Sequence, residues 1–375
     1  MNKETRYKAI SLFSGCGGID IGISQTHFDI LASIEIDPYA CETLRANNVR
    51  MGGKTIIIEK DIRKINPKDL MNELELKVGE LDLLCGGPPC QAFSQIGKRN
   101  SLSDDRGMLL FEMVRYTEVL KPKTLMIEQV KGLLSAQDES GKVGGVFEKL
   151  LYQLEKLGYV PKWKIINSAE YGVPQLRQRV FIIATQKPNE FQFPLPTYID
   201  SKKSSILFSL KPYKTVGEVI GDLGKPYKLN GHIPEDSHLD VTPDGDIYRI
   251  KGVKEGSHLA CELDLPIEQR KSLSKKDTTK FKRLSRSKPS NTLRCGEIFF
   301  HPLEDRYLTP REYLRIHGYP TDYLLKGPIR GRSGRVRFLD QHRQVANSVP
   351  PPVAKALALS ILEVLKNKVQ HAKNF

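Results

Sequence analysis

Through the first half of the chain, short runs of apolar residues alternate with longer stretches in which apolar residues recur every three or four positions. The short runs are typical of buried β-strands, and the longer stretches are typical of amphipathic helices. The pattern predicts strands at residues 9–13, 30–35, 55–59, 81–84 and 124–127, and helices at residues 39–47, 108–120 and 146–157. Strands that alternate with helices in this way predict a doubly wound α/β domain with a mostly parallel sheet.

The alternation ends near the middle of the chain. Two more β-rich segments, residues 162–167 and 180–185, flank a loop rich in Gln and Arg and are expected to close the sheet as an antiparallel pair. Prolines then interrupt a segment rich in Gly, Ser and Lys, which predicts a domain boundary near residue 187. A helical pattern at residues 354–365 is expected to rejoin the first domain. The expected division is a first domain of residues 1–186 and 345–375, a second, smaller domain of residues 187–330, and a hinge of residues 331–344.

Positive charge points to a polyanionic partner. The chain of 375 residues has a formal net charge of +14, and a field of this size concentrates polyanions near a protein. Nucleic acid is therefore the leading class of partner, and the alternative is a basic surface that only water solvates. The densest positive charge, nine basic residues against one acidic residue, lies at residues 270–288. This run is expected either to follow a phosphate backbone or to form a solvated loop.

Cysteine usage and hydropathy bear on the cellular setting. The six cysteines are scattered, without the paired spacing of a zinc site or the density of a disulfide scaffold. The first ten residues lack the apolar core of a signal peptide, and no stretch approaches the roughly 20 apolar residues that a membrane span needs. The sequence therefore predicts a soluble, cytoplasmic protein that does not insert into membranes.

A glycine-rich turn follows the first predicted strand. Gly15, Gly17 and Gly18 lack Cβ atoms, which allows a tight turn and a close approach of the backbone to a ligand. Glu35 ends the second predicted strand, where an acidic residue binds the ribose hydroxyls of a nucleotide-like cofactor in doubly wound folds. The turn predicts a ribose-bearing ligand, and the alternative is a purely structural strand-to-helix turn.

The spacing of these glycines differs from the G-x-G-x-x-G of dinucleotide sites, which disfavours a bound pyrophosphate. An adenosine ligand without phosphates fits a strand end that carries Phe13 and a third strand followed by Asp61, whose carboxylate is expected to accept from the adenine amino group. S-adenosylmethionine is the common ligand of that description.

A cysteine lies in a rigid loop after the strand at residues 81–84. The loop reads C-G-G-P-P-C-Q-A-F-S over residues 85–94, and its two prolines fix the backbone beside Cys90. A nucleophile must be held close to its line of attack, so catalysis explains this rigidity better than packing does. Cys85, inside the strand, is expected to be a small core residue instead.

Three charged residues accompany this loop. Glu128 ends a strand at the same edge of the sheet, where it is expected to act as an acid or base, or else as a helix cap or surface residue. Arg177 and Arg179 alternate along a predicted strand and are expected to point to one face. They are expected to hold a substrate or phosphate, or to form surface ion pairs.

Together these residues resemble the C5-cytosine DNA methyltransferase family, over nearly the whole chain and in the family's motif order. The turn F-S-G-C-G-G resembles the family's cofactor loop, and G-P-P-C-Q-A-F-S resembles its nucleophile loop. Residues 306–320, R-Y-L-T-P-R-E-Y-L-R-I-H-G-Y-P, are similar to its late structural motif, and N-S-V-P-P-P-V-A at residues 347–354 is similar to its closing motif. The variable stretch between the arginines and the late motif, roughly residues 187–305, corresponds to its target-recognition region.

The resemblance implies a role for each matching position. Catalytic roles fall on Cys90, Glu128, Arg177 and Arg179. Cofactor contacts fall on Phe13, Ser14, Gly15, Cys16, Gly17, Gly18, Glu35, Ile36, Asp61, Ile62, Pro89, Leu109, Asn347 and Ser348. Substrate contacts fall on Gln91, Ser94 and, in a Thr-Leu element that closes on the extruded base, on Thr292, Leu293 and Arg294. The chain departs from the family at Gln129 (usually Asn), Ala346 (usually Gly) and Ile36 (often aromatic), which is expected to affect cofactor affinity.

The activity implied is transfer of a methyl group from S-adenosylmethionine to carbon 5 of a cytosine flipped out of double-stranded DNA, without a metal and with S-adenosylhomocysteine as product. Cys90 would attack carbon 6 of the ring, Glu128 would hold the ring nitrogen and amine, and the arginines would orient the base. The compact form implies a bacterial or phage modification role. A monomer carries a complete site, and any cognate restriction endonuclease is expected to act on the same DNA sequence without a stable complex.

Three other functions are alternatives to this one. A transfer-RNA cytosine methyltransferase shares the catalytic motifs, but the long recognition region favours DNA. A catalytically inactive DNA-binding relative is disfavoured because Cys90, Glu128, Arg177 and Arg179 are all retained. A dinucleotide oxidoreductase accounts for the glycine turn but gives the Pro-Pro-Cys loop no role.

Overall fold

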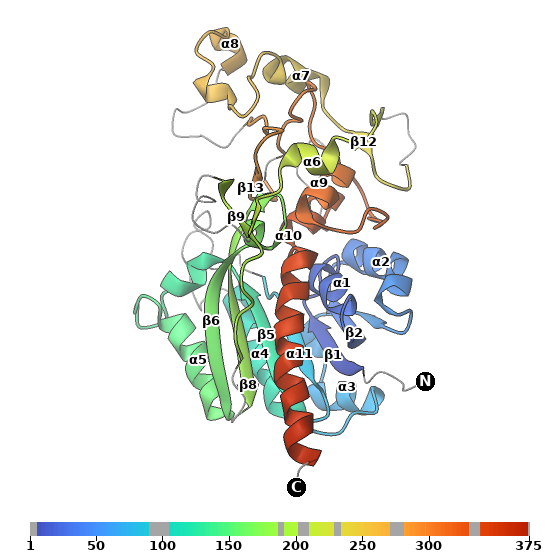
Figure 1. Cartoon of the computed structure of the whole chain (residues 1–375), viewed down its shortest axis with the longest axis vertical. Coiled ribbons are helices and arrows are strands. Elements are labelled where there is room, and N and C mark those ends of the chain that lie inside the picture. The colour runs from blue at the N-terminus through green and yellow to red at the C-terminus, as the bar shows by residue number, and fades with distance from the viewer. Residues whose placement is uncertain are drawn as a thin grey trace. The chain divides into compact units, whose positions relative to one another are not determined.

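The structure is a computed structural model that describes residues 6–89, 105–186, 191–201, 210–228, 234–270, 281–296, 298–329 and 338–373, without the side chains of residues 105–108 and 367–373. The chain forms two compact units (Figure 1). Unit 1 comprises Met1–Asn167, Gln178–Leu195 and Val353–Phe375, and unit 2 comprises Ser168–Arg177 and Pro196–Pro352. These divisions differ by several residues from the expected boundaries at 187 and 345, and the roles expected of the two domains stay predictions.

Unit 1 is built on a seven-stranded sheet with the order β3-β2-β1-β4-β5-β8-β6. Its strands are β1 (Tyr7–Leu12), β2 (Phe28–Glu35), β3 (Ile56–Glu59), β4 (Leu83–Gly86), β5 (Thr124–Gln129), β6 (Tyr159–Asn167) and β8 (Gln178–Gln186). The first five run parallel, and β8 lies antiparallel between β5 and β6. The predicted doubly wound sheet and its antiparallel closure are confirmed. Because the strand order reverses at β1, the carboxyl ends of β1 and β4 form the switch point at which such folds bind ligands.

Helices connect the strands, as the periodicity predicts. They are α1 (Gly18–Ser24), α2 (Pro38–Ala46), α3 (Pro67–Glu73), α4 (Asp105–Leu120), α5 (Gly145–Lys156) and α11 (Pro351–Lys373), with 3₁₀ turns at Asn48–Met51, Ile62–Lys64 and Lys131–Ser135. Helix α2 begins where the sequence favours it, because the Asp37 side chain accepts a hydrogen bond from the Ala40 amide and Pro38 occupies the first helical position. The expected C-terminal helix is α11, which belongs to unit 1 from Val353 onward.

One face of the sheet packs against α3, α4 and α5. Alternate residues of each strand point to this face, such as Ile10 and Leu12 in β1 and Leu125 and Ile127 in β5, and they share one core with apolar residues of the three helices. Figure 1 shows α11 in red, running in front of the sheet. Its residues between Val353 and Leu365 are mostly buried.

The segment Gln341–Lys366 is long and apolar enough to cross a membrane, with a mean hydropathy of 1.3, which the sequence analysis did not expect. However, 67% of the 18-residue apolar window in this segment is buried inside the protein, which is also typical of a core helix.

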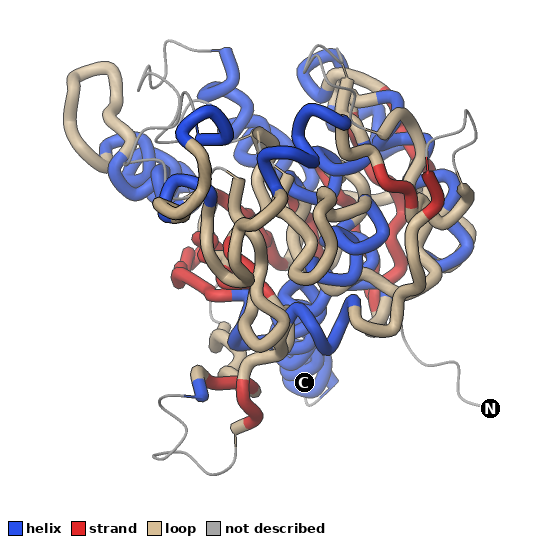
Figure 2. The backbone as a smooth tube through the Cα atoms, turned by 90° about the horizontal axis from the view of Figure 1, so that it is seen from above, coloured by secondary structure: helices blue, strands red, loops and turns tan. Residues whose placement is uncertain are grey.

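Unit 2 has little regular structure. Figure 2 shows the loops of the chain in tan. Its helices are α6 (Val216–Ile220), α7 (Asp244–Ile250), α8 (Ile267–Arg270), α9 (Pro310–His317) and α10 (Gln341–Asn347), with 3₁₀ turns at Ser168–Tyr171 and Leu259–Cys261. Three parallel pairs of two-residue strands are β7 (Gln175–Leu176) with β13 (Ser290–Asn291), β9 (Tyr198–Ile199) with β10 (Lys211–Pro212), and β11 (Tyr227–Lys228) with β12 (Leu239–Asp240).

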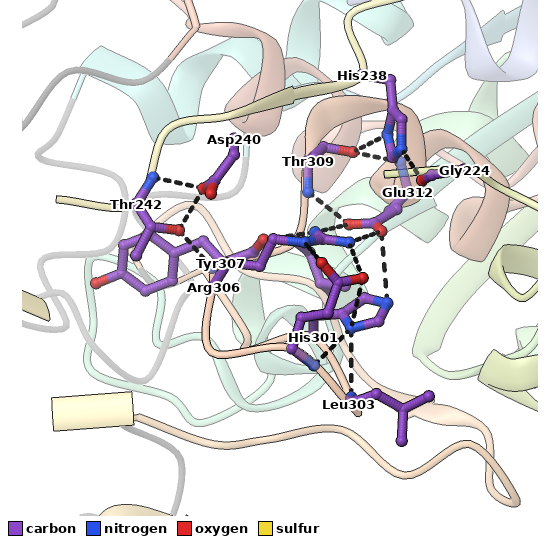
Figure 3. A network of polar contacts seen from close by, with 12 residues as sticks. Gly224, His238, Asp240, Thr242, His301, Leu303, Arg306, Tyr307, Thr309 and Glu312 are labelled. Carbon is purple, nitrogen blue, oxygen red and sulfur yellow. Dashed lines mark hydrogen bonds and ion pairs between the residues drawn. The ribbon is translucent and has the colours of Figure 1, made fainter. Parts of the chain in front are cut away.

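A buried polar network at the start of α9 holds part of unit 2 together (Figure 3). Arg306 forms two hydrogen bonds with the Glu312 carboxylate, at 2.8 and 2.9 Å, and both residues are almost fully buried. Glu312 also accepts from the Thr309 amide, while the Thr309 hydroxyl bonds to the Glu312 amide and to His238. Burial alone would lower the pKa of Arg306, but its hydrogen bonds and ion pair with Glu312 raise this pKa above its ordinary value. The bidentate pair therefore stays charged inside the protein.

Two further buried arginines bind the main chain. The Arg283 guanidinium donates to the carbonyl oxygens of Ile250, Val253, His301 and Glu304. Arg311 donates in the same way to the carbonyls of Asp236, Thr321 and Tyr323. Each guanidinium therefore joins loops that are distant in sequence and replaces the ladder of hydrogen bonds that a sheet would supply.

We expect Arg306→Met to lower the free energy of unfolding of unit 2 by about 3–5 kcal/mol, because it leaves the buried Glu312 carboxylate without its ion partner. Hydrogen exchange of the α9 amides during a urea titration measures this loss. Arg286→Met is the matched control, since the exposed pair of Arg286 with Glu255 is expected to contribute about 1 kcal/mol or less. Equal losses in the two variants would contradict a stabilising role for the buried pair.

Candidate active site

The turn between β1 and α1 has a strained backbone that only its sequence allows. Gly15 and Gly17 have φ values of 54° and 79°, and Phe13 adopts a φ of 53°, which is uncommon for a residue with a side chain. The Ser14 amide donates to the Ile34 carbonyl at 3.1 Å, which ties the turn to β2. A Cβ atom added at Gly15 would meet no atom within 4 Å. The turn is therefore fixed in shape and open beside Gly15, as a site for a close-fitting ligand requires.

Glu35, at the end of β2, is hydrogen-bonded to this turn. One carboxylate oxygen accepts from the Gly15 amide at 2.8 Å, and the other accepts from the amides of Ile36 and Asp37, each at 2.8 Å. Burial raises the pKa of Glu35, while the three amides favour its charged form. The carboxylate thus lies at the same strand end as the glycine turn, where it can accept hydrogen bonds from ribose hydroxyls.

A second carboxylate, which the sequence analysis did not single out, lies beneath the turn. Asp20 in α1 is completely buried and accepts hydrogen bonds from the hydroxyls of Ser11 and Ser33. Ser14 of the turn donates in turn to the Ser11 hydroxyl at 2.9 Å. Burial raises the pKa of Asp20, and the two serine hydroxyls oppose this shift. In the sequence, the one feature that could have indicated this network is an acidic residue, Asp20, between the apolar residues of a short helix.

The other predicted cofactor positions have varied surroundings. Asp61 follows β3 and binds the guanidinium of Arg63, which lowers the pKa of Asp61. The Ile62 side chain lies in the core of unit 1, while Ile36 is 61% exposed beside Glu35. Leu109 packs against the same core from α4. Their contacts with a cofactor stay predictions.

The segment before Cys90 is held tightly against its neighbours. A Cβ atom at Gly86 would lie 2.7 Å from the Leu12 carbonyl oxygen, so only glycine lets β4 end this close to β1. A Cβ atom at Gly87 would lie 3.3 Å from a carboxylate oxygen of Glu128. The carbonyl of Pro88 accepts from the Gln129 side chain at 2.8 Å. Pro89 is the last described residue here, and the predicted site residues Cys90, Gln91 and Ser94 lie outside the described residues.

Glu128 and Arg179 form an ion pair at the end of β5. The Arg179 Nε atom lies 3.0 Å from a carboxylate oxygen of Glu128, whose residue is only 8% exposed. The pair forms because β8 runs antiparallel to β5, so that the first residues of β8 lie beside the last residues of β5. The structure therefore brings Glu128, Arg179 and Gly87 together, with a charge-assisted contact that orients the carboxylate.

Arg177 is placed differently from the expectation that both arginines alternate along one strand. Strand β8 begins at Gln178, and Arg177 lies before it in unit 2, where its amide donates to the Gln175 carbonyl. This turn separates Arg177 from β8, so the two arginines do not lie on one continuous strand. The Arg177 side chain is buried and donates to the carbonyl of Ser348 at 3.0 Å.

A chain of side-chain hydrogen bonds links three predicted segments of unit 2. Gln175 accepts from the Leu293 amide at 3.1 Å, and its own amide nitrogen lies 3.0 Å from Nδ1 of His317. The other ring nitrogen of His317 lies 3.0 Å from the Ser348 carbonyl oxygen. Thr292 also donates to the Leu176 carbonyl, and the thiol of Cys295 donates to the Asn347 side chain. The Thr-Leu element and the closing motif are thus joined through Gln175 and His317, neither of which the sequence analysis noted.

Comparison with known proteins decides the family. The sequence matches the model of the family described as "C-5 cytosine-specific DNA methylase" over residues 7–363. The chain belongs to this family. It is 31% identical to the Type II methyltransferase M.NgoFVII of Neisseria gonorrhoeae, over 98% of this chain and 90% of that protein. It is also 31% identical to the Type II methyltransferase M1.HphI of Haemophilus parahaemolyticus, over 96% of this chain and 87% of that protein.

Solved structures agree at the level of the fold. A protein described as a DNA modification methyltransferase of an Escherichia coli prophage superposes with a TM-score of 0.68 at 20% identity, over 96% of this chain and 99% of that one. DNMT2 of Spodoptera frugiperda superposes with a TM-score of 0.58 at 17% identity, over 95% and 99% of the two chains. The predicted fold of the C-5 cytosine-specific DNA methylases is therefore confirmed.

In the part that the structure describes, residues 270 and 281–288, the basic run of this DNA methylase contributes less positive charge to the protein surface than its sequence suggests. Arg283 is buried on main-chain carbonyls, and Arg286 pairs with Glu255 at 3.2 Å. Burial lowers the pKa of Lys282. Residues 271–280 of the run lie outside the described residues. In the described part of the run, part of the charge therefore supports the fold. No group of three or more metal-binding side chains occurs among the residues that the structure describes.

The buried carboxylate of Asp20 predicts a pH dependence of stability. Its pKa is raised in the fold, so the folded DNA methylase keeps this proton at pH values at which the unfolded chain has lost it. The contribution of Asp20 to the free energy of unfolding should therefore fall as the pH rises from the ordinary pKa of 3.8 to the raised one.

Urea denaturation of the wild type and of Asp20→Asn, followed by the fluorescence of the single tryptophan, Trp163 in β6 of unit 1, measures this effect. The stability of the wild type relative to the variant should decrease as the pH rises above the ordinary pKa of 3.8. A difference that does not change with pH would show that Asp20 titrates alike in both states.

Proposed function

We propose that this chain transfers a methyl group from S-adenosylmethionine to carbon 5 of a cytosine in a specific sequence of double-stranded DNA. The observation that carries the proposal is the Glu128–Arg179 pair at the switch-point edge of the sheet, next to Gly87 and the segment that leads to Cys90. A carboxylate held in one orientation by a guanidinium suits recognition of the nitrogen edge of a cytosine. Membership of the C-5 cytosine-specific DNA methylase family supports the same substrate.

The residues around the first turn fit S-adenosylmethionine. The space beside Gly15 is open, Glu35 presents a carboxylate at the end of β2, and Asp61 presents another at the end of β3. Glu35 would hold the ribose hydroxyls and Asp61 the adenine amine, while Asn347 and Ser348 would complete the site. When bound, the cofactor supplies an electrophilic methyl group.

The chain's own residues would prepare the cytosine for methylation. Carbon 5 is a weak nucleophile, so the Cys90 thiolate would add to carbon 6 and push electron density toward carbon 5. Glu128, protonated or sharing a proton with ring nitrogen N3, would stabilise the negative charge that develops there and hold the amine, while Arg179 keeps its carboxyl group oriented. After methylation, loss of the carbon-5 proton and release of the Cys90 thiolate restore the aromatic ring.

Unit 2 would recognise the DNA. A cytosine reaches such a site only after it is flipped out of the duplex, at a cost of a few kcal/mol. Thr292, Leu293 and Arg294 would contact the flipped base. The Leu293 amide donates to the Gln175 side chain and the Thr292 hydroxyl donates to the Leu176 carbonyl, and these bonds hold this segment in place. Basic side chains would bind phosphates and make the affinity salt-dependent.

The biological role proposed is protection of DNA as part of restriction and modification. The most similar relatives reported above are Type II methyltransferases, and the chain spans most of their length. We propose that the protein acts in the cytoplasm as a monomer. Any partner endonuclease would read the same DNA sequence without forming a stable complex with it.

Cys90→Ser should abolish methyl transfer and leave DNA binding intact, because a serine hydroxyl is a far weaker nucleophile toward carbon 6. The assay incubates the protein with tritiated S-adenosylmethionine and unmethylated genomic DNA, beside a transfer-RNA control, and maps the product by methylcytosine sequencing. Undiminished turnover of the variant would exclude Cys90 as the nucleophile. Label in RNA alone would identify an RNA methyltransferase, and no label in either would identify an inactive DNA-binding relative.

Cofactor affinity should fall as the pH is lowered through the raised pKa of Glu35, because the protonated carboxyl loses an acceptor for the ribose hydroxyls. The loss should begin above the ordinary pKa of 4.5. Calorimetric titration with S-adenosylhomocysteine, which has the same ribose, measures it for the wild type and for Glu35→Gln. The variant should bind more weakly near neutral pH with a flatter pH profile, and parallel profiles would rule out Glu35 as the titrating group.

A further inference from the structure

Gln129 is held in a defined position, and the proposed mechanism gives it no role. It is the last residue of β5, directly after Glu128, and it is completely buried. Its side-chain nitrogen donates to the Pro88 carbonyl at 2.8 Å, and its side-chain oxygen accepts from the Val130 amide at 3.1 Å. Both ends of the amide are therefore used, one on the chain that leads to Cys90 and the other on the chain that leaves Glu128.

The sequence comparison with the family suggested that Gln129, which stands in place of the usual asparagine, affects cofactor affinity. The contacts of Gln129 point elsewhere. Its hydrogen bonds reach Pro88 and Val130, whereas Glu35 and the Gly15 turn are held by main-chain amides and by the Ser14–Ile34 bond. A substitution at Gln129 should accordingly act on the geometry of the catalytic groups.

Pro88 is buried but lies beyond the strand pairing of β4. Proline has no amide hydrogen, so Pro88 cannot donate to a neighbouring strand, and Pro89 after it cannot either. Strand pairing on both sides of β4 ends at Gly86, which faces Leu12 and Ile127. Beyond that point, the hydrogen bond from Gln129 is a polar tie between this segment and β5.

We propose that Gln129 is a positioning residue, which sets the spacing between the nucleophile loop and Glu128. The bond to Pro88 holds the chain two residues before Cys90 against the end of β5. Glu128, whose carboxyl group would hold the cytosine ring, is the residue before Gln129 in the same strand. The proposal rests on the proposed function, in which Cys90 and Glu128 act on the same base.

The direct test is Gln129→Met, which keeps the length of the side chain and removes both hydrogen bonds. We expect kcat for DNA methylation to fall about 10- to 100-fold, because small displacements of reacting groups have effects of this size. The dissociation constant for S-adenosylhomocysteine, measured by calorimetry, should stay within about twofold of the wild-type value, since the contacts at Gly15 and Glu35 are unchanged. Gln153→Met, on α5 of unit 1, is the matched control and should change neither quantity.

A second variant tests the hydrogen bond itself. Gln129→Glu keeps an acceptor for Val130 but presents a donor to the Pro88 carbonyl only when its carboxyl is protonated. The ratio of its kcat to the wild-type kcat should therefore rise as the pH falls. If Gln129→Glu simply folded less well, its kcat would be lower, but the ratio to the wild-type kcat would not rise as the pH falls.

An unchanged kcat in Gln129→Met, a loss that follows weaker cofactor binding, or a pH-independent ratio for Gln129→Glu would each overturn the proposal. The wild-type rate is a separate control for the proposed function. If the wild type and Cys90→Ser are equally active or equally inactive on DNA, the proposed function fails. If only the Gln129 variants behave like the wild type, the positioning role alone fails.

Discussion

Polar side chains at the switch-point edge of the sheet lie out of the water, and a buried polar group costs free energy unless it is hydrogen-bonded inside the protein. This constraint shapes the whole candidate site. Glu35 is bonded by three main-chain amides, Asp20 by two serine hydroxyls and Glu128 by the guanidinium of Arg179. In each case at least one partner comes from another element of the fold. Satisfying these groups therefore fixes the turn, the strand ends and the Glu128 carboxylate relative to one another before any substrate binds.

The same constraint acts in unit 2 with different means. Its paired strands are two residues long, so few of its carbonyl groups find partners in a ladder. Arg283 and Arg311 supply those partners, and Arg306 binds Glu312 instead. The charge that the sequence presents as a basic surface is in these places an internal support. Composition alone does not separate the two uses of arginine, because both give the same net charge.

Much of unit 1 could be predicted from the sequence. The alternation of apolar runs with helical stretches gives its strands and helices, and the rule that parallel sheets bind ligands at their carboxyl edge leads to Gly15, Glu35 and Glu128. Contacts between distant residues could not be predicted in this way. Gln129 and Pro88 are 41 positions apart, and nothing in the local pattern of either predicts their hydrogen bond. The sequence places Arg177 and Arg179 on one strand, but a turn at Gln175 separates Arg177 from β8.

The buried arginines of unit 2 bind main-chain carbonyl oxygens, and a carbonyl is present at every residue whatever its side chain. Arg283 reaches the carbonyls of Ile250, Val253, His301 and Glu304, and it would find the same acceptors if these positions carried other residues of suitable size. Loops anchored in this way can exchange their outward side chains without losing their attachment. Mutations in these loops can therefore change the outer surface of unit 2 while its internal support stays the same.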